Sequence, residues 1–147
     1  MKTEETISIL EEPLVAYGMP TSVNPTILVG LIGKLDSVFN HLEYIKENTE
    51  SSDDTIAYWL NVNVKTYRNY RAENAVLKPD VKEHLIILAA ITKHGLQVFE
   101  THKSFSKWLK TDNFMLGGQK PTDLLNTNSG VRLVDDRLTG MEYGDNA

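Results

Sequence analysis

A glycine pair, a proline three residues later and then a helical stripe of apolar residues constrain the C-terminal part of the chain. Gly117-Gly118 supplies backbone freedom at positive φ, and Pro121 suits the first position of a helical turn, where no N–H donor is needed. A polar stretch at 126–129 is rich in residue types that cap helices. Apolar residues at helical spacing follow, namely Val131, Val134, Leu138 and Met141. The pattern predicts a turn, a short helical turn and a longer helix.

This stretch belongs to a longer series of elements in a fixed order. The elements are Trp108-Leu109, the run from Leu116 to Leu125 that holds Gly117, Gly118 and Pro121, the Thr127-x-x-Gly130 motif, and Glu142-Tyr143-Gly144. The series resembles the C-terminal toxin-binding domain of the Xre/MbcA/ParS antitoxins, which partner RES-domain toxins in bacterial toxin–antitoxin pairs. The resemblance implies that residues 101–147 are a small helical domain that binds such a toxin.

The resemblance also implies how the toxin is neutralised. A RES-domain toxin consumes or transfers from NAD, and the last residues of the antitoxin enter or cover its active site. Asp145 and Asn146 would offer acceptors to cationic groups that otherwise engage the NAD pyrophosphate. Members of the family commonly have aromatic residues after the glycine; residues 144–147 have none, so a polar or shallower occlusion is expected. The predicted toxin-binding residues are Leu116, Gly117, Gly118, Glu142, Tyr143, Gly144, Asp145, Asn146 and Ala147.

A second pattern, at residues 56–71, is typical of a helix-turn-helix. Ala57 suits a close crossing of two helices, Asn61 can adopt the left-handed conformation of a tight turn, and Val62 suits a side chain that fills the core between the helices. Asn63 can cap the second helix, in which Tyr67 and Tyr70 are expected to face inward. The stretch resembles an Xre-like helix-turn-helix.

The outward face of this second helix is the expected DNA-binding surface. In a helix-turn-helix the first turns of the second helix enter the major groove, and a homodimer would place two such helices on two half-sites of an operator. The residues predicted to contact DNA are Lys65, Thr66, Arg68, Asn69 and Arg71. The alternative is a helical hairpin that packs well and contacts no DNA.

Charge is unevenly distributed along the chain, whose net charge is −5. Residues 1–54 and 121–147 are acidic, whereas residues 55–120 hold ten lysines and arginines against five acids. The basic segment contains the predicted DNA-binding surface, which agrees with a nucleic-acid contact. Charge fluctuations of this size are also common in short chains.

The remaining patterns predict an all-α fold. Residues 1–24 are interpreted as an arm, and Asn24-Pro25 as the start of a short helix. Residues 81–100, preceded by Pro79-Asp80, form the longest helical pattern and are apolar on most sides, as expected of a central connecting helix. The predicted domains are the arm at 1–24, an Xre-like helix-turn-helix domain at 25–100 and the toxin-binding domain at 101–147.

No catalytic, metal or cofactor site is predicted, and the protein is not expected to be an enzyme. The chain has no cysteine, and His41, His84, His94 and His102 are interpreted as packing or surface residues. Asp135-Asp136, near Arg132 and Arg137 on one helix, suggests solvated ion pairs. The acidic first residues lack an apolar run, so a cytoplasmic protein without a membrane segment is expected.

Two alternatives to an antitoxin that binds both toxin and operator DNA follow from the sequence. One is a stand-alone transcriptional regulator whose C-terminal domain dimerises or senses a ligand, which leaves the pattern from Leu116 to Gly144 without a reason. The other keeps toxin binding and lacks DNA binding, which the acidic first fifty residues favour.

Overall fold

The computed structural model describes residues 38–72 and 75–144 of the chain. The predicted arm at 1–24, the helix expected after Asn24-Pro25 and the last three residues lie outside these ranges. Within them all regular elements are helical, which confirms the predicted all-α fold. The elements are α3 (Val38–Thr49), α4 (Asp53–Trp59), α5 (Val64–Tyr70), α6 (Pro79–Phe99), α7 (His102–Leu109), the 3₁₀ turns η1 (Phe114–Leu116) and η2 (Pro121–Leu124), and α8 (Asn128–Glu142).

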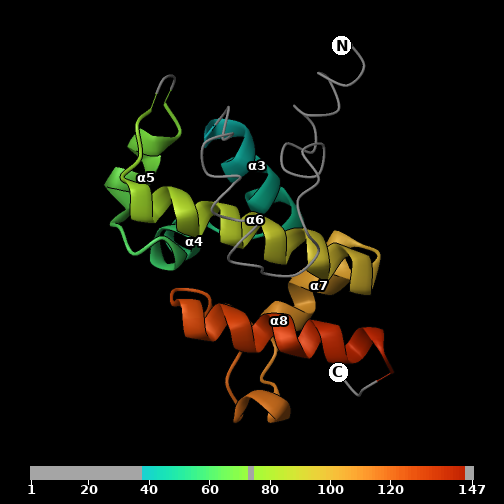
Figure 1. Cartoon of the computed structure of the whole chain (residues 1–147). Coiled ribbons are helices and arrows are strands. Elements are labelled where there is room, and N and C mark those ends of the chain that lie inside the picture. The colour runs from blue at the N-terminus through green and yellow to red at the C-terminus, as the bar shows by residue number, and fades with distance from the viewer. Residues whose placement is uncertain (1–37, 73–74, 145–147) are drawn as a thin grey trace.

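Helix α6 is the centre of the fold. It passes between α3 on one side and α8 on the other, with α4 and α5 near its N-terminal end and α7 at its C-terminal end (Figure 1). Its residues 84–92 are all buried. This burial confirms the prediction from its apolar pattern, because a helix that is apolar on most sides must be covered on most sides. The division predicted at residue 100 stays a prediction, and one continuous core extends from α3 to α8 across it.

The turn between α6 and α7 depends on a glycine. A Cβ atom at Gly95 would lie 2.1 Å from Cε1 of Phe105, so α7 packs against α6 at a distance that only glycine permits. Phe105 is fully buried and forms an aromatic cluster with Phe99 and Trp108, whose ring centroids lie 5.5 to 6.4 Å apart. Gly95 therefore lies at a close crossing of α6 and α7.

Helix α8 begins at a second close approach. Thr127 is its N-cap and accepts a hydrogen bond from the backbone N–H of Gly130 at 3.0 Å. A Cβ atom at Gly130 would lie 1.8 Å from the carbonyl oxygen of Leu124, which belongs to the backbone of η2. The predicted stripe then packs inward, since Val131, Val134 and Leu138 are buried. The Thr-x-x-Gly motif therefore both caps α8 and seats it on η2.

Gly130→Ala is expected to destabilise the fold. The added methyl group overlaps a backbone oxygen, which can move only if η2 shifts, so a loss of roughly 3 kcal/mol in the free energy of unfolding is expected. Urea unfolding followed by circular dichroism measures it. Ser129→Ala is the matched control, because Ser129 is exposed in the same helical turn. Equal stability of the two variants would contradict the close approach.

Candidate functional site

The predicted Gly-Gly turn is a compact loop from Asn113 to Gln119. Gly117 and Gly118 have φ of 70° and 84°, values that favour glycine. Asn113 is buried and organises the loop through four hydrogen bonds. Its Oδ1 accepts from the N–H of Met115 at 2.9 Å, its carbonyl oxygen accepts from the N–H groups of Leu116 and Gly118, and its N–H donates to the carbonyl of Gln119. The loop is therefore fixed by its own backbone.

Side chains of this loop point in opposite directions. Leu116 is buried in the core, whereas Phe114 is 91% exposed and Met115 is 55% exposed. Two further large apolar side chains of the C-terminal region, Leu133 and Tyr143, are also exposed. Of these four exposed residues, only Tyr143 is among the predicted toxin-binding residues. Phe114 and Met115 directly precede Leu116-Gly117-Gly118, and this position was the available sequence signal for a binding role. Periodicity could not show that they are exposed, because it cannot assign a face to a three-residue turn.

The remaining predicted toxin-binding residues have different environments. Gly117, Gly118, Tyr143 and Gly144 are exposed, and Gly144 leaves α8 with φ of 98°. Leu116 is buried, which gives it a structural role beneath the loop. Residues 145–147 lie outside the described ranges. The assignment of these residues to toxin binding stays a prediction.

Glu142, another predicted toxin-binding residue, takes part in a bridge between α6 and α8, in which His94 and Asp135 are buried and the side chain of Glu142 is 38% exposed. The imidazole of His94, which is fully buried, donates from Nδ1 to Oδ1 of Asp135 at 2.7 Å and from Nε2 to Oε1 of Glu142 at 2.6 Å. Only a protonated imidazole donates from both ring nitrogens. The bridge joins the C-terminal part of α6 to the end of α8 from which residues 143 and 144 continue.

The interpretation of Asp135 as a solvated partner of nearby arginines is wrong. Asp135 is buried, and its carboxylate accepts the hydrogen bond from His94, which is 41 residues away in the sequence. Sequence spacing on α8 could not reveal this, because the partner lies on another helix.

Opposing effects set the pKa of His94. Burial by itself lowers the pKa of the imidazole, because it removes water from the charged form. The hydrogen bonds and the negative charges of Asp135 and Glu142 act in the other direction and prevail, so the pKa is raised above the usual 6.5. His94 is therefore held as a cation between two carboxylates.

The stretch predicted to be a helix-turn-helix consists of α4, residues 60–63 and α5, and its assignment to that motif stays a prediction. Asn61 has φ of 60°, as predicted for the turn, and the N–H of Val62 donates to the carbonyl of Ala57 at 3.0 Å. Asn63 caps α5 by accepting from the N–H of Thr66 at 2.8 Å. Tyr67 is fully buried, which fixes the inward face of α5. The local geometry is that of two short helices joined by a tight turn.

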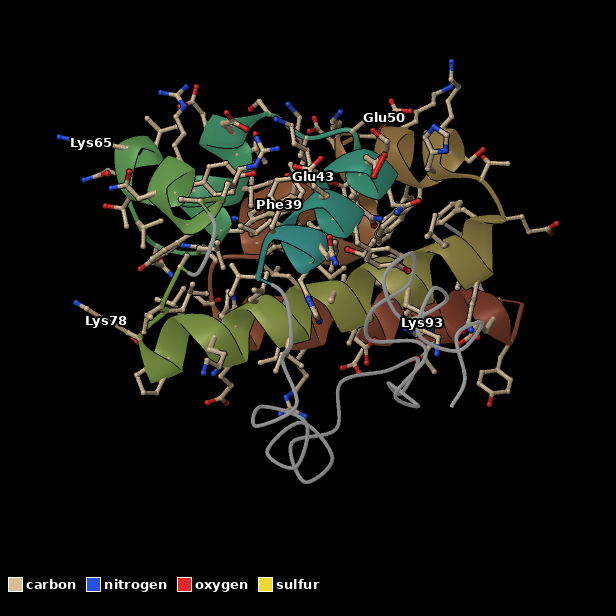
Figure 2. The ribbon with its side chains drawn as sticks, turned by 90° about the horizontal axis from the view of Figure 1, so that it is seen from above. Phe39, Glu43, Glu50, Lys65, Lys78 and Lys93 are labelled. Atoms are coloured by element: carbon tan, nitrogen blue, oxygen red, sulfur yellow. The ribbon has the colours of Figure 1, made fainter. Side chains whose placement is uncertain are left out.

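The predicted DNA-binding residues divide into two groups. Lys65, Arg68 and Asn69 are exposed, and Lys65 extends away from α5 at the edge of the molecule (Figure 2). Thr66 and Arg71 are partly buried. The guanidinium of Arg71 contacts the carboxylates of Glu43 and Asp53, so α3 and α4 already provide acceptors for it. Nε of Arg68 lies 3.5 Å from Asp53, but the side chain is largely exposed.

Side chains of α4, the following turn and α6 hold the segment that contains η2. Nε1 of Trp59, the hydroxyl of Tyr58 and Nδ2 of Asn61 donate to the carbonyls of residues 122, 123 and 126, each at 2.8 Å. Nε2 of His84 donates to the carbonyl of Leu125, also at 2.8 Å. Helix α4 and its following turn are therefore hydrogen-bonded to the chain segment that precedes α8.

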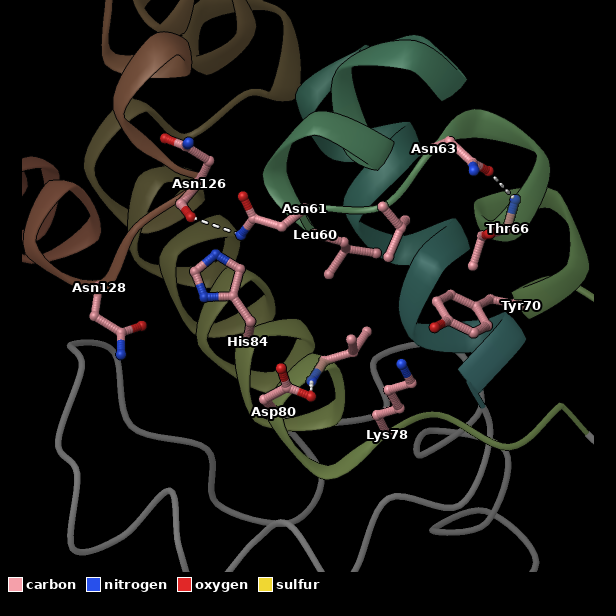
Figure 3. A pocket seen from close by; sticks show the side chains of 12 residues that line it. Leu60, Asn61, Asn63, Thr66, Tyr70, Lys78, Asp80, His84, Asn126 and Asn128 are labelled. Atoms are coloured by element: carbon pink, nitrogen blue, oxygen red, sulfur yellow. Dashed lines mark hydrogen bonds between the residues drawn. The ribbon is translucent and has the colours of Figure 1, made fainter.

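An open polar cleft of about 610 Å³ lies beside these contacts. The helix-turn-helix, the start of α6 and the start of α8 line it, with Asn61, Asn63, Lys78, His84 and Asn128 among its residues (Figure 3). The hydrogen bonds of Asn61 and Asn63 within the protein are visible there. Among the described residues, no group of histidine and acidic side chains is arranged to hold a metal ion.

A comparison with known families bears on the C-terminal region. Residues 94–144 match the family of the antitoxin Xre/MbcA/ParS C-terminal toxin-binding domain. The matched range starts at His94 and contains the Asn113–Gln119 loop, η2 and α8. It supports the role of an antitoxin that binds a toxin in a toxin–antitoxin pair. No curated protein matches the chain. In the part of the chain that the structure describes, no helix is long and apolar enough to cross a membrane.

His94→Gln is expected to lower stability in a pH-dependent way. Glutamine cannot keep both carboxylates paired, and breaking the buried pair with Asp135 costs roughly 3 kcal/mol, whereas the partly exposed Glu142 contributes less. Because the pKa of His94 is raised in the folded protein, its contribution is fully present below pH 6.5 and is lost as the pH rises through the folded pKa. The difference in unfolding free energy between wild type and variant should therefore shrink as the pH rises.

Urea unfolding at several pH values from about 6 to about 9 measures this difference. His102→Gln is the control, because His102 is largely exposed and its ion pair with Glu50, at 3.2 Å, lies at the surface. A His94 effect that is independent of pH would contradict a charged imidazole.

Proposed function

We propose that the protein is the antitoxin of a type II toxin–antitoxin pair that neutralises a RES-domain, NAD-consuming toxin. The observation that carries the proposal is the match of residues 94–144 to a toxin-binding domain of antitoxins. The antitoxin acts by binding and has no catalytic step of its own. It is a cytoplasmic protein in this proposal, and its toxin is encoded beside it.

The C-terminal tail covers the active site of the toxin in this proposal. Support comes from the end of α8, where Tyr143 is 86% exposed and Gly144 turns the backbone away from the helix. Tyr143 offers a large contact area at low entropic cost, and the following Asp145 and Asn146 offer oxygen acceptors. Cationic groups of the toxin that bind the pyrophosphate of NAD would donate hydrogen bonds to these oxygens in its place. The His94–Glu142 hydrogen bond supports this role by fixing the helix end.

Co-expression with the product of the adjacent gene tests this function. The neighbour alone should stop growth and deplete cellular NAD, and this protein should restore both and co-purify with the neighbour. A chain truncated after Tyr143 should still co-purify but should restore NAD less well, because the tail that occludes the active site is missing.

Full protection by the truncated chain would contradict occlusion by the tail. A harmless neighbour that does not associate with the protein would contradict the antitoxin function, and the stand-alone regulator would then explain the helix-turn-helix better. Both results are read from the same growth and NAD measurements.

The protein also represses its own operon in this proposal, as a homodimer that places two α5 helices on two half-sites. Support comes from the tight turn at Asn61 and from two exposed cations of α5, Lys65 in its first turn and Arg68 in its last. Lysine and arginine at this position contribute both phosphate contacts and base contacts. The acceptors that Arg71 already has within the fold make it the least available of the five predicted residues.

The double substitution Lys65→Ala with Arg68→Ala is expected to weaken operator binding and leave toxin binding unchanged. If both side chains contact phosphates, the dependence of affinity on salt should become less steep, by about two in the logarithmic slope. Gel shifts of the upstream DNA at several salt concentrations measure the change. Lys103→Ala with Lys107→Ala is the matched control, since both lysines are exposed on α7. Unchanged operator affinity in the α5 variant would refute the assignment.

A further inference from the structure

The most exposed large apolar side chain that the structure describes lies outside every predicted site. Phe114 is 91% exposed, and Met115 beside it is 55% exposed, in a loop whose third apolar residue, Leu116, is buried. Burial of a phenylalanine side chain contributes about 1.5 to 3 kcal/mol, so its exposure leaves that free energy available for a partner. Single exposed apolar residues are common on protein surfaces. Phe114 and Met115 differ from such cases because they are adjacent on one loop with a hydrogen-bonded backbone.

The loop holds Phe114 and Met115 in place before any partner binds. The four hydrogen bonds of Asn113 and the positive φ angles of Gly117 and Gly118 fix its backbone, and Leu116 fastens it to the core. Ordering a loop on binding opposes association, and a loop that is already ordered avoids this loss. Part of the orange connection between α7 and α8 extends beyond α8 on the side away from α6 (Figure 1). The loop is therefore both rigid and accessible.

The surroundings of Phe114 and Met115 are typical of apolar side chains that bind another protein. Exposed polar residues precede and follow it in the loop, namely Thr111, Asp112, Gln119 and Lys120. Interfaces commonly place aromatic and methionine side chains at the centre and polar residues at the rim. A phenyl ring and a thioether have no means of recognising phosphate groups, so DNA is not the partner that they fit. The loop lies inside residues 94–144, the range that matches a toxin-binding domain.

We propose that Phe114 and Met115 form a hydrophobic anchor that inserts into an apolar pocket on the toxin, apart from the contact made by the C-terminal tail. This inference rests on the proposed function, which supplies the partner. The two contacts have separate tasks. The anchor provides affinity through buried apolar area, and the tail provides inhibition through polar groups in the active site. Leu116, by contrast, stays in the core of the antitoxin and contributes only to the position of the loop.

The test compares the affinity of full-length variants for the purified product of the adjacent gene by titration calorimetry. Phe114→Ala with Met115→Ala should weaken binding at least about thirtyfold, the loss typical of an interface hot spot. Phe114→Leu, which keeps an apolar side chain, should lose less. Val76→Ala is the matched control, because Val76 is 89% exposed and precedes α6, outside the matched range. Its affinity should stay within about twofold, as expected for a surface substitution.

Unfolding midpoints equal to that of the wild type should accompany these affinities, because Phe114 and Met115 contribute little to the core. The chain truncated after Tyr143 should keep most of its affinity while it loses protection of NAD, which separates the anchor from the tail. Wild-type affinity in the Phe114 and Met115 variant would overturn the anchor and leave the proposed function standing. Absence of binding by the wild type would overturn both.

A second copy of this chain is the other occupant that the pair could fit. Sedimentation of the wild type and of the double variant distinguishes it. An oligomer that the variant loses, together with unchanged affinity for the neighbour's product, would assign the pair to self-association and would overturn the toxin anchor.

Discussion

The burial of α6 is the constraint on which the rest of the structure depends. A helix of 21 residues with apolar side chains on most sides cannot be stable until it is covered, and α3 and α8 cover opposite sides of it. Gly95 lets α7 approach its C-terminal part, and Gly130 lets α8 pack against the backbone of η2. Covering one apolar helix therefore sets the positions of the helices that carry both candidate surfaces.

Hydrogen bonds from side chains to the backbone then connect the parts of the fold that carry these two surfaces. Helix α4 and the turn that follows it donate three side-chain hydrogen bonds to backbone carbonyls between residues 122 and 126, and α6 donates a fourth through His84. These carbonyls belong to a 3₁₀ turn and its flanks. The hydrogen bond to Leu125 is buried and satisfies an acceptor that water does not reach, whereas those to residues 123 and 126 are exposed. The surface of α5 and the loop at Asn113–Gln119 consequently belong to one packed and hydrogen-bonded fold, although they bind different partners in the proposed function.

The end of α8 is fixed by charge as well as by packing. His94 is a buried cation held between Asp135 and Glu142, and this arrangement stabilises the fold only while all three groups keep their charges. The buried hydrogen bond between His94 and Asp135 favours one register of α8 on α6, because a shift of either helix would break it. The tail that follows Tyr143 begins from this fixed point, which suits a segment that must enter the active site of another protein.

The sequence by itself determined the local structure, because caps, glycine turns and helical periodicity are encoded in contiguous residues. The start of α6 at Pro79, the turn at Asn61, the cap at Asn63, the Gly-Gly loop and the inward stripe of α8 were all predicted from such patterns. Only the tertiary structure decided which polar groups meet. Asp135 pairs with His94 across 41 residues, and Trp59 reaches the carbonyl of Thr122 across 63. It also decided that Phe114 is exposed while Leu116 is buried, since the face of a short 3₁₀ turn is set by the helix packed beneath it and by no repeat in the sequence.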